Sequence, residues 1–261
     1  MKSKLIILGC GSSVGVPRID GFWGRCNKNN KKNNRSRCSA IIIKGSNSIL
    51  IDTSPDLRKQ LLSNNIKNIS SVIFTHEHAD QTNGLFELRP FYWKNKKKIN
   101  VFGNPHTIKH LKKSQGYLFK KAINYPPIVK ANIINSKFSL GQLNEKIHFK
   151  VINAKHGKTK SLIYIFENSA YVSDTNDLSI VKNKEMQNLK YLIIDCLKFK
   201  KHPSHFNLQE SIFVHNSLKP KKTILTNLHY DLDYDFLLRN LPKNVLPAYD
   251  GLTLDLLNEK K

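Results

Sequence analysis

The chain has 261 residues, 39% of them apolar, and its 43 basic and 19 acidic residues give a formal net charge of +24. This composition supports a large core, and we expect one domain over residues 1–261 because no change in composition marks a boundary. The longest apolar runs have strand length, far below the roughly 20 residues of a membrane-spanning helix, so no transmembrane helix is expected. The apolar stretch after Met-Lys-Ser-Lys is too short for a secretory signal, so we expect a cytoplasmic protein.

The positive charge suggests nucleic-acid binding, but its distribution argues against a dedicated nucleic-acid face. Only seven basic residues are Arg, and 28 Asn are scattered with the Lys along the whole chain. We interpret this as compositional drift that makes the surface generally basic. The four cysteines, Cys10, Cys26, Cys38 and Cys196, have wide and irregular spacing, which is typical of reduced thiols rather than of a disulfide framework.

Short apolar segments separated by turns and amphipathic segments predict many strands and a few helices. The expected strands are 4–8, 40–44, 48–51, 71–74, 99–102, 147–152, 162–166, 170–173, 191–195 and 223–226. The expected helices run from 55 to about 62, from 105 to 113 and from 207 to about 218, with Asn207 as an N-cap. A long loop, 9–39, separates the first two strands. Because early strands form hairpins and later ones alternate with helices, we expect two mixed, mostly antiparallel sheets covered by helices.

A cluster of metal-ligand side chains directly follows the apolar strand 71–74. In the segment Thr75-His76-Glu77-His78-Ala79-Asp80-Gln81, His76, His78 and Asp80 stand at alternate positions. Imidazole nitrogens and carboxylate oxygens bind Zn²⁺, Mn²⁺ or Fe²⁺, and a loop at a strand end can bring them to one ion. This pattern favours a catalytic metal site over a polar turn with incidental histidines.

Other residues of the same chemistry follow apolar strands later in the chain. His156 follows strand 147–152, Asp174 ends strand 170–173, and His229 comes three residues after strand 223–226. Each residue alone is more often a satisfied polar side chain, but four strand ends with ligand chemistry together favour one metal centre.

At these residues the sequence resembles the metallo-β-lactamase superfamily, whose HxHxDH motif corresponds to His76-x-His78-x-Asp80-Gln81. Within that superfamily it resembles the PhnP-like phosphodiesterases, which act on phosphoribosyl cyclic phosphates. The resemblance implies an αββα sandwich with two divalent ions, Zn²⁺ or Mn²⁺, in a cleft between the sheets. It extends over most of the chain, through segments 8–17, 50–58, 76–84, 156–157, 171–174 and 228–229.

The resemblance also assigns the ligands: His76, His78 and His156 for one ion, Asp80 and His229 for the second, and Asp174 between the two. Gln81 departs from the motif, because an imidazole usually stands there. An amide oxygen is a weaker and harder ligand, so the second ion is expected to bind less tightly. Some PhnP-like proteins hold an additional zinc through closely spaced cysteines in the early loop. Here the loop offers only Cys26, with Cys38 twelve residues later, so we expect no structural zinc.

Hydrolysis of a phosphate diester needs a proton donor for the leaving alkoxide, and the segment after strand 191–195 contains two histidines. By the resemblance to PhnP-like and RNase Z-like enzymes, His205 is the preferred general acid and His202 the next candidate, with Asp80 as the remaining catalytic candidate. The alternative is that they are surface histidines in a basic loop.

Arginine is scarce in this chain, which draws attention to Arg35, Arg37 and Arg89 as candidates for binding substrate phosphate. A guanidinium binds phosphate through two hydrogen bonds, whereas Lys acts as a point charge. Structural ion pairs are the equally weighted alternative.

The preferred function is a metal-dependent phosphodiesterase for a small cyclic phosphate diester. An RNase Z-like nuclease is the second candidate, because the fold is shared and the charge is strongly positive, with RNA as its partner. A catalytically silent nucleic-acid-binding protein is the third, and Gln81 is the feature that favours it. No membrane partner is expected, and a homodimer is compatible with the sequence.

Overall fold

Two seven-stranded sheets form the centre of the computed structural model, which describes residues 3–257 other than 122 and 124. The first sheet contains, in spatial order, β14 (Leu252–Asp255), β1 (Ser3–Gly9), β2 (Ser39–Lys44), β3 (Asn47–Ile51), β4 (Ser71–Ile73), β5 (Ile99–Gly103) and β6 (Val129–Ile133). The second contains β13 (Val245–Pro247), β12 (Lys222–Thr226), β11 (Tyr191–Asp195), β10 (Ser169–Val172), β9 (Thr159–Phe166), β8 (Ile147–His156) and β7 (Lys137–Leu140).

Each sheet is antiparallel in one half and parallel in the other. Pairing is antiparallel from β14 to β3 and parallel from β3 to β6. In the second sheet it is antiparallel from β7 to β10 and parallel from β10 to β13. The mixed sheets are therefore confirmed, but antiparallel pairs are not the majority. The difference arises because several strands are joined through helical crossovers, which return the chain in the same direction.

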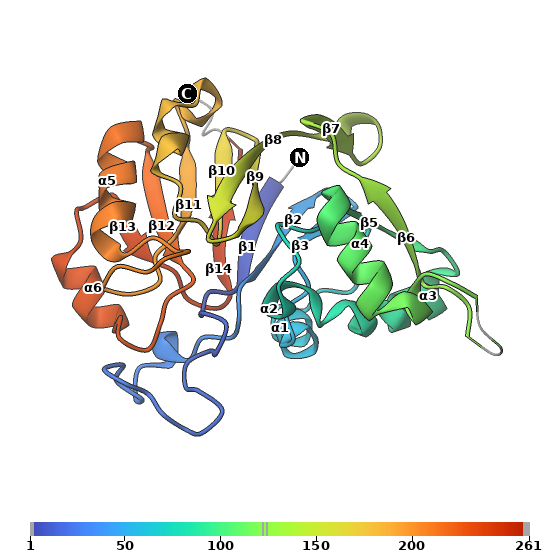
Figure 1. Ribbon diagram of the computed structural model, residues 1–261, viewed down its shortest axis with the longest axis horizontal. Coiled ribbons are helices and arrows are strands. Elements are labelled where there is room, and N and C mark those ends of the chain that lie inside the picture. Colours follow the sequence, from blue (N-terminus) through green and yellow to red (C-terminus); the bar gives the residue numbers. More distant parts are fainter. Residues whose placement is uncertain (1–2, 122, 124, 258–261) are drawn as a thin grey trace.

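Helices cover the outer faces of both sheets, α1–α4 on one side of the molecule and α5 and α6 on the other (Figure 1). The α-helices are α1 (Leu57–Ser63), α2 (Ala79–Thr82), α3 (Arg89–Asn95), α4 (Pro105–Ser114), α5 (Leu208–Leu218) and α6 (Tyr234–Asn240). The 3₁₀ turns are η1 (Lys31–Asn33), η2 (Leu85–Leu88), η3 (Gly116–Leu118), η4 (Leu143–Glu145), η5 (Leu178–Lys182) and η6 (Lys184–Met186). The predicted cap of α5 is confirmed, because Asn207 and Glu210 form a capping box.

The core has three layers because the central strands are buried on both faces. In β2, Ile42 belongs to the cluster between the sheets, and its neighbour Ile41 packs outward with residues of α1 and α4. In β11, Ile193 faces the space between the sheets and Leu192 packs toward α5. Burial on both faces explains why these strands read as continuous apolar runs rather than as alternating patterns.

The strand pairings bring several polar strand ends to one edge of the sandwich. β3 runs parallel to β4, and β10, β11 and β12 run parallel to one another, so their carboxyl ends lie together within each sheet. The long segment 9–39 is irregular apart from η1 and short bridges such as Val16 to Arg35, as predicted. Within the described residues, every helix is too short or too polar to cross a membrane.

Candidate metal centre

Tight turns follow three of the strands that end at this edge. Asp52 after β3, Asp174 after β10 and Asn227 after β12 have φ values of 61°, 32° and 60°. This left-handed conformation is uncommon for residues other than glycine, and such residues cluster at functional sites. All three side chains are buried. The local backbone is therefore adapted to hold polar side chains at the strand ends.

Three imidazole rings from the two sheets meet at this edge. His76 Nε2 lies 3.0 Å from His78 Nδ1, and His156 Nε2 lies 3.3 Å from the same His78 atom. His76 and His78 come from the turn after β4, whereas His156 ends β8. Nitrogen atoms this close around one point are the arrangement that a shared metal ion would stabilise.

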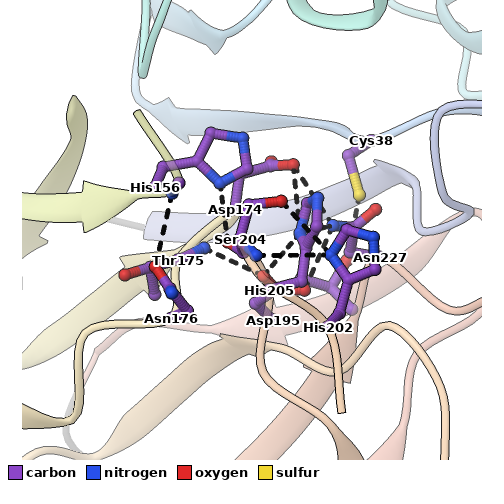
Figure 2. A network of polar contacts seen from close by, with 12 residues as sticks. Cys38, His156, Asp174, Thr175, Asn176, Asp195, His202, Ser204, His205 and Asn227 are labelled. Carbon is purple, nitrogen blue, oxygen red and sulfur yellow. Dashed lines mark hydrogen bonds and ion pairs between the residues drawn. The ribbon is translucent and has the colours of Figure 1, made fainter. Parts of the chain in front are cut away.

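In His76 and His156, a hydrogen bond at Nδ1, the ring nitrogen that faces away from the centre, determines which nitrogen carries the proton. Thr75 Oγ1 donates to Asp52 Oδ2 (2.8 Å), so its one proton is used, and His76 Nδ1 must donate to Thr75 Oγ1 (3.0 Å). His156 Nδ1 donates to the Ser204 carbonyl oxygen (2.8 Å; Figure 2). Both rings therefore direct an unprotonated Nε2 toward the centre, as metal-binding histidines do. Burial lowers the pKa of His76 to about 3 and also lowers the pKa of His156, which keeps both rings neutral.

Asp174 lies beside these rings. In the part of the chain that the structure describes, two groups bring potential ligand atoms within 4.8 Å of one another: His76, His78 and His156, and His156, Asp174 and His205. Burial raises the pKa of Asp174, but His76, His205 and His156 outweigh it, and the net pKa is lowered. The carboxyl group is therefore ionised and available to a cation.

Asp80 and Gln81 lie next to this group at the start of α2. Gln81 Nε2 is 3.3 Å from Asp80 Oδ2 and 3.4 Å from Asp174 Oδ2. Asn227 approaches from β12, with its Nδ2 3.2 Å from Asp174 Oδ1 and 3.1 Å from Asp195 Oδ1 (Figure 2). Two side-chain amides thus contact the carboxylates on this side of the site.

His229 belongs to neither of these two groups, and its role as a ligand remains a prediction. Its Nδ1 lies 3.3 Å from Asp231 Oδ2, and its ring packs against Tyr230 with 3.5 Å between centroids. The reason is local: Asn227 is the residue at which the chain turns after β12, and it carries the side chain that enters the site. His229 lies two residues farther on.

His205 forms a close pair with Asp195 at the end of β11. His205 Nδ1 donates to Asp195 Oδ2 at 2.8 Å, and the same oxygen accepts the Thr175 backbone N–H at 2.9 Å. Burial lowers the pKa of His205, but Asp195 and Asp174 outweigh it and raise the pKa to about 9. His202 lies alongside, with 5.1 Å between the ring centroids, and its Nδ1 is 3.2 Å from Ser204 Oγ. Of the two candidates, only His205 has a carboxylate that holds its proton.

The three candidate arginines have different environments. Arg35 is 1% exposed and donates to Asn33 Oδ1 (3.1 Å) and to the His229 carbonyl oxygen (3.4 Å). Contrary to the prediction, it is therefore not accessible to a substrate phosphate. Arg89 lies over the ring of Tyr125, 5.9 Å from its centroid. Arg37 forms a two-pronged ion pair with Asp56 at 2.8 and 2.7 Å, and Asp80 is among the charges that raise its pKa.

The four cysteines are buried free thiols. Cys26 Sγ lies 3.8 Å from Arg35 Nη1, and Cys38 Sγ lies 3.5 Å from Thr226 Oγ1. The absence of a structural zinc remains a prediction.

Sequence reasoning did not single out Asp52, Asp195 or Asn227 as functional residues. Each directly follows or ends a buried apolar strand, which is the same signal that identified His156 and Asp174. The signal was therefore present at Asn227 as well as at His229, two residues farther on.

Known proteins share the fold of this chain. The sequence matches the Beta-lactamase superfamily domain over residues 47–230. The crystal structure of a diphosphatase from the PhnP family is 29% identical, with a TM-score of 0.87 over 98% of this chain and 97% of that one. Human short-form tRNase Z is 15% identical with a TM-score of 0.69, over 98% of this chain and 100% of that one, which shows the fold alone.

A curated relative has a different name and a longer chain. The octanoyltransferase of Porphyromonas gingivalis (strain ATCC BAA-308 / W83) is 27% identical over 260 residues. The match covers 98% of this chain and 52% of that protein, so the chain spans about half the length of this relative.

The sandwich of mixed sheets and the histidine and carboxylate groups at its edge define a metal-dependent hydrolase. The donor atoms at the edge are those that a divalent cation binds. The chain belongs to the metallo-β-lactamase superfamily and is a PhnP-like member of it. The αββα fold and the family predicted from the motif at His76 are thereby confirmed.

Proposed function

We propose that this protein hydrolyses a small phosphate diester, of the phosphoribosyl cyclic phosphate class, with the help of a divalent metal ion. The observation that carries the proposal is the placement of the His205–Asp195 pair beside three imidazoles whose ring nitrogens converge. This arrangement combines a metal site with a separate proton donor, which are the two parts that ester hydrolysis needs. The similarity to a PhnP-family diphosphatase supports a phosphate compound as substrate.

The residues present fit a divalent ion. His76, His78, His156 and Asp174 would hold it, because two of the rings have their lone pairs oriented inward by Thr75 and Ser204. Three imidazole nitrogens and one carboxylate suit Zn²⁺ or Mn²⁺. When bound, such an ion lowers the pKa of a water molecule and polarises a phosphoryl oxygen.

His205 would give a proton to the leaving alkoxide. Its Nδ1 proton is engaged by Asp195 Oδ2, so Nε2 is the nitrogen that can release a proton toward substrate. The raised pKa, about 9, keeps the ring charged near neutral pH. Asp80, at the start of α2, would orient the attacking water by accepting its hydrogen bond. Arg37 is the arginine that we retain for the anionic substrate group.

The proposed function is tested by comparing three substrates at equal concentration: a ribosyl cyclic phosphate, a nucleoside diphosphate and a short RNA. We expect the cyclic diester to give the highest kcat/KM, and His205→Ala to reduce it. Faster cleavage of RNA, with a steep fall in activity as salt rises, would support the nuclease alternative that the net charge of +24 favours. Faster cleavage of the nucleoside diphosphate would indicate that the substrate is a phosphoanhydride rather than a phosphate diester. Either of these outcomes would contradict the proposal.

A further inference from the structure

Two buried amides occupy the side of the site where a second metal ion would need ligands. A second ion would lie between Asp80 and Asp174 and would require further lone pairs directed toward it. The atoms that face these carboxylates are Gln81 Nε2 and Asn227 Nδ2. An amide nitrogen donates hydrogen bonds and has no lone pair to offer a cation. We propose that this protein binds a single divalent ion, and that the two amides replace the second ion by hydrogen bonding to Asp80 and Asp174.

The orientation of Asn227 is determined by its partners. Its Nδ2 lies 3.2 Å from Asp174 Oδ1, 3.1 Å from Asp195 Oδ1 and 3.1 Å from His205 Nδ1. A reversed amide would lose the bonds to both carboxylates and would place its oxygen against two negatively charged groups, and the Nδ1 proton of His205 that it would face is already donated to Asp195 Oδ2. Asn227 is 1% exposed, so water cannot compensate for that loss. Its oxygen is therefore not available to a cation between Asp80 and Asp174.

Gln81 also directs its amide nitrogen toward two carboxylates, at longer distances than Asn227 does. Its Nε2 lies between Asp80 Oδ2 (3.3 Å) and Asp174 Oδ2 (3.4 Å). Its Oε1 is buried and has no hydrogen-bond partner among the described residues. Turning the amide over would place this oxygen against two carboxylates, whereas the nitrogen can donate to both. Only a cation at this position would favour turning the oxygen inward.

His229 is the remaining candidate ligand for a second ion. His229 contacts Asp231 and Tyr230, and its Nδ1 belongs to neither ligand group. In contrast, the three-histidine group has two unprotonated Nε2 atoms, of His76 and His156, that converge on His78 and suit a cation. The inference depends on this ligand group of the proposed function but not on the proposed substrate.

Metal content tests the inference without an activity assay. The full chain is stripped with a chelator, dialysed against Mn²⁺ or Zn²⁺, and analysed by elemental mass spectrometry. We expect one ion per chain. The Mn²⁺ form is expected to give the electron paramagnetic resonance spectrum of an isolated ion, because two adjacent Mn²⁺ ions would couple magnetically.

Variants test whether the two amides are the reason that the chain binds a single ion. Gln81→His with Asn227→His supplies two imidazoles to Asp80 and Asp174, and we expect this double variant to bind two ions per chain. His229→Ala is the matched control, and we expect it to keep one ion. His78→Ala is expected to bind none.

Two ions per wild-type chain, or a coupled Mn²⁺ spectrum, would overturn the inference and leave the proposed function intact. No bound ion would overturn both. Loss of one ion in His229→Ala would restore that histidine as a ligand and also overturn the inference. The wild-type stoichiometry and spectrum decide the question even if the double variant does not fold.

Discussion

His205 Nδ1 lies 2.8 Å from Asp195 Oδ2, and the same carboxylate is held by the backbone N–H of Thr175. A buried carboxylate that is fixed in this way keeps the imidazole in one orientation and stabilises its charged form. His205 is therefore better suited to donate a proton than to act as a fourth metal-binding histidine.

His205→Ala should slow hydrolysis in a way that depends on the leaving group. For an alkyl phosphate diester we expect kcat to fall by about 10²- to 10⁴-fold, the usual contribution of general acid catalysis. For bis(p-nitrophenyl) phosphate we expect a much smaller fall, because p-nitrophenolate leaves without a proton. Steady-state kinetics with both substrates check this prediction.

His202→Ala is the control for that experiment, because His202 lies beside His205 without a carboxylate partner. We expect it to change kcat little for either substrate. Equal losses in His205→Ala for the two substrates would show that His205 does not act as an acid.

Thr75→Val should weaken metal binding without removing a ligand. The hydroxyl links Asp52 to His76 and fixes the ring with its Nε2 unprotonated. Loss of such a supporting hydrogen bond typically reduces metal affinity by about 10- to 100-fold. Titration calorimetry with Zn²⁺ measures the change.

Thr107→Val provides the comparison, because Thr107 Oγ1 is buried without a hydrogen-bond partner among the described residues and Thr107 lies on α4. It should leave the Zn²⁺ affinity unchanged. An unchanged affinity in Thr75→Val would mean that this threonine does not orient His76.

Metal removal should lower the melting temperature of the folded chain. An ion that binds only the folded state stabilises it by about 2.7 kcal/mol when free metal is 100-fold above its Kd. We therefore expect thermal unfolding to shift upward with added Zn²⁺ or Mn²⁺ in the wild type. In His156→Ala the shift should be lost, and an undiminished shift would place the ion elsewhere.

The Arg37–Asp56 pair should make stability depend on pH in acid. Burial raises the pKa of Asp56, but the hydrogen bonds and charge of Arg37 outweigh it, so the net pKa lies below the usual value of 3.8. A lowered folded-state pKa gives stability that is present above about pH 4 and is lost as the pH falls through the folded pKa.

Urea unfolding of metal-free protein at pH 7 and at pH 3 measures this effect. We expect Asp56→Asn to lower the unfolding free energy at pH 7 by about 1–3 kcal/mol and to reduce the difference between the two pH values. Asp20→Asn removes the solvent-exposed partner of Arg18 and should have little effect. A loss at pH 3 as large as that at pH 7 would contradict the account.

The sequence predicted the central strands and the sandwich because burial of both strand faces produces long apolar runs, such as those at Ile41 and Ile193. It did not predict β6, β7, β13 or β14, which lie toward the sheet edges and lack such runs. It predicted the direction of pairing less well. Hydrophobic periodicity reports which residues are buried but does not report which strand is the neighbour, so the parallel halves of the sheets were underestimated.

For the candidate site, too, the sequence predicted what depends on a local signal and did not predict what depends on tertiary contacts. His76, His78 and His156 come together because His76 and His78 follow β4 and His156 ends β8 at the same edge, and the strand signal is local. The choice between Asn227 and His229 depends on the turn at which the chain leaves β12, and the scarcity of arginine could not reveal that Arg35 is buried. These features arise from tertiary contacts between distant segments.

The central claim is that a divalent ion held by the three-histidine group is required for phosphate diester hydrolysis. The most direct measurement is turnover of bis(p-nitrophenyl) phosphate by chelator-stripped protein, before and after addition of Mn²⁺ or Zn²⁺, with His78→Ala measured in parallel. We predict no turnover without metal, recovery on addition of one of the two ions, and no recovery in His78→Ala. Turnover that persists in the stripped protein, or that His78→Ala recovers fully, would contradict the claim.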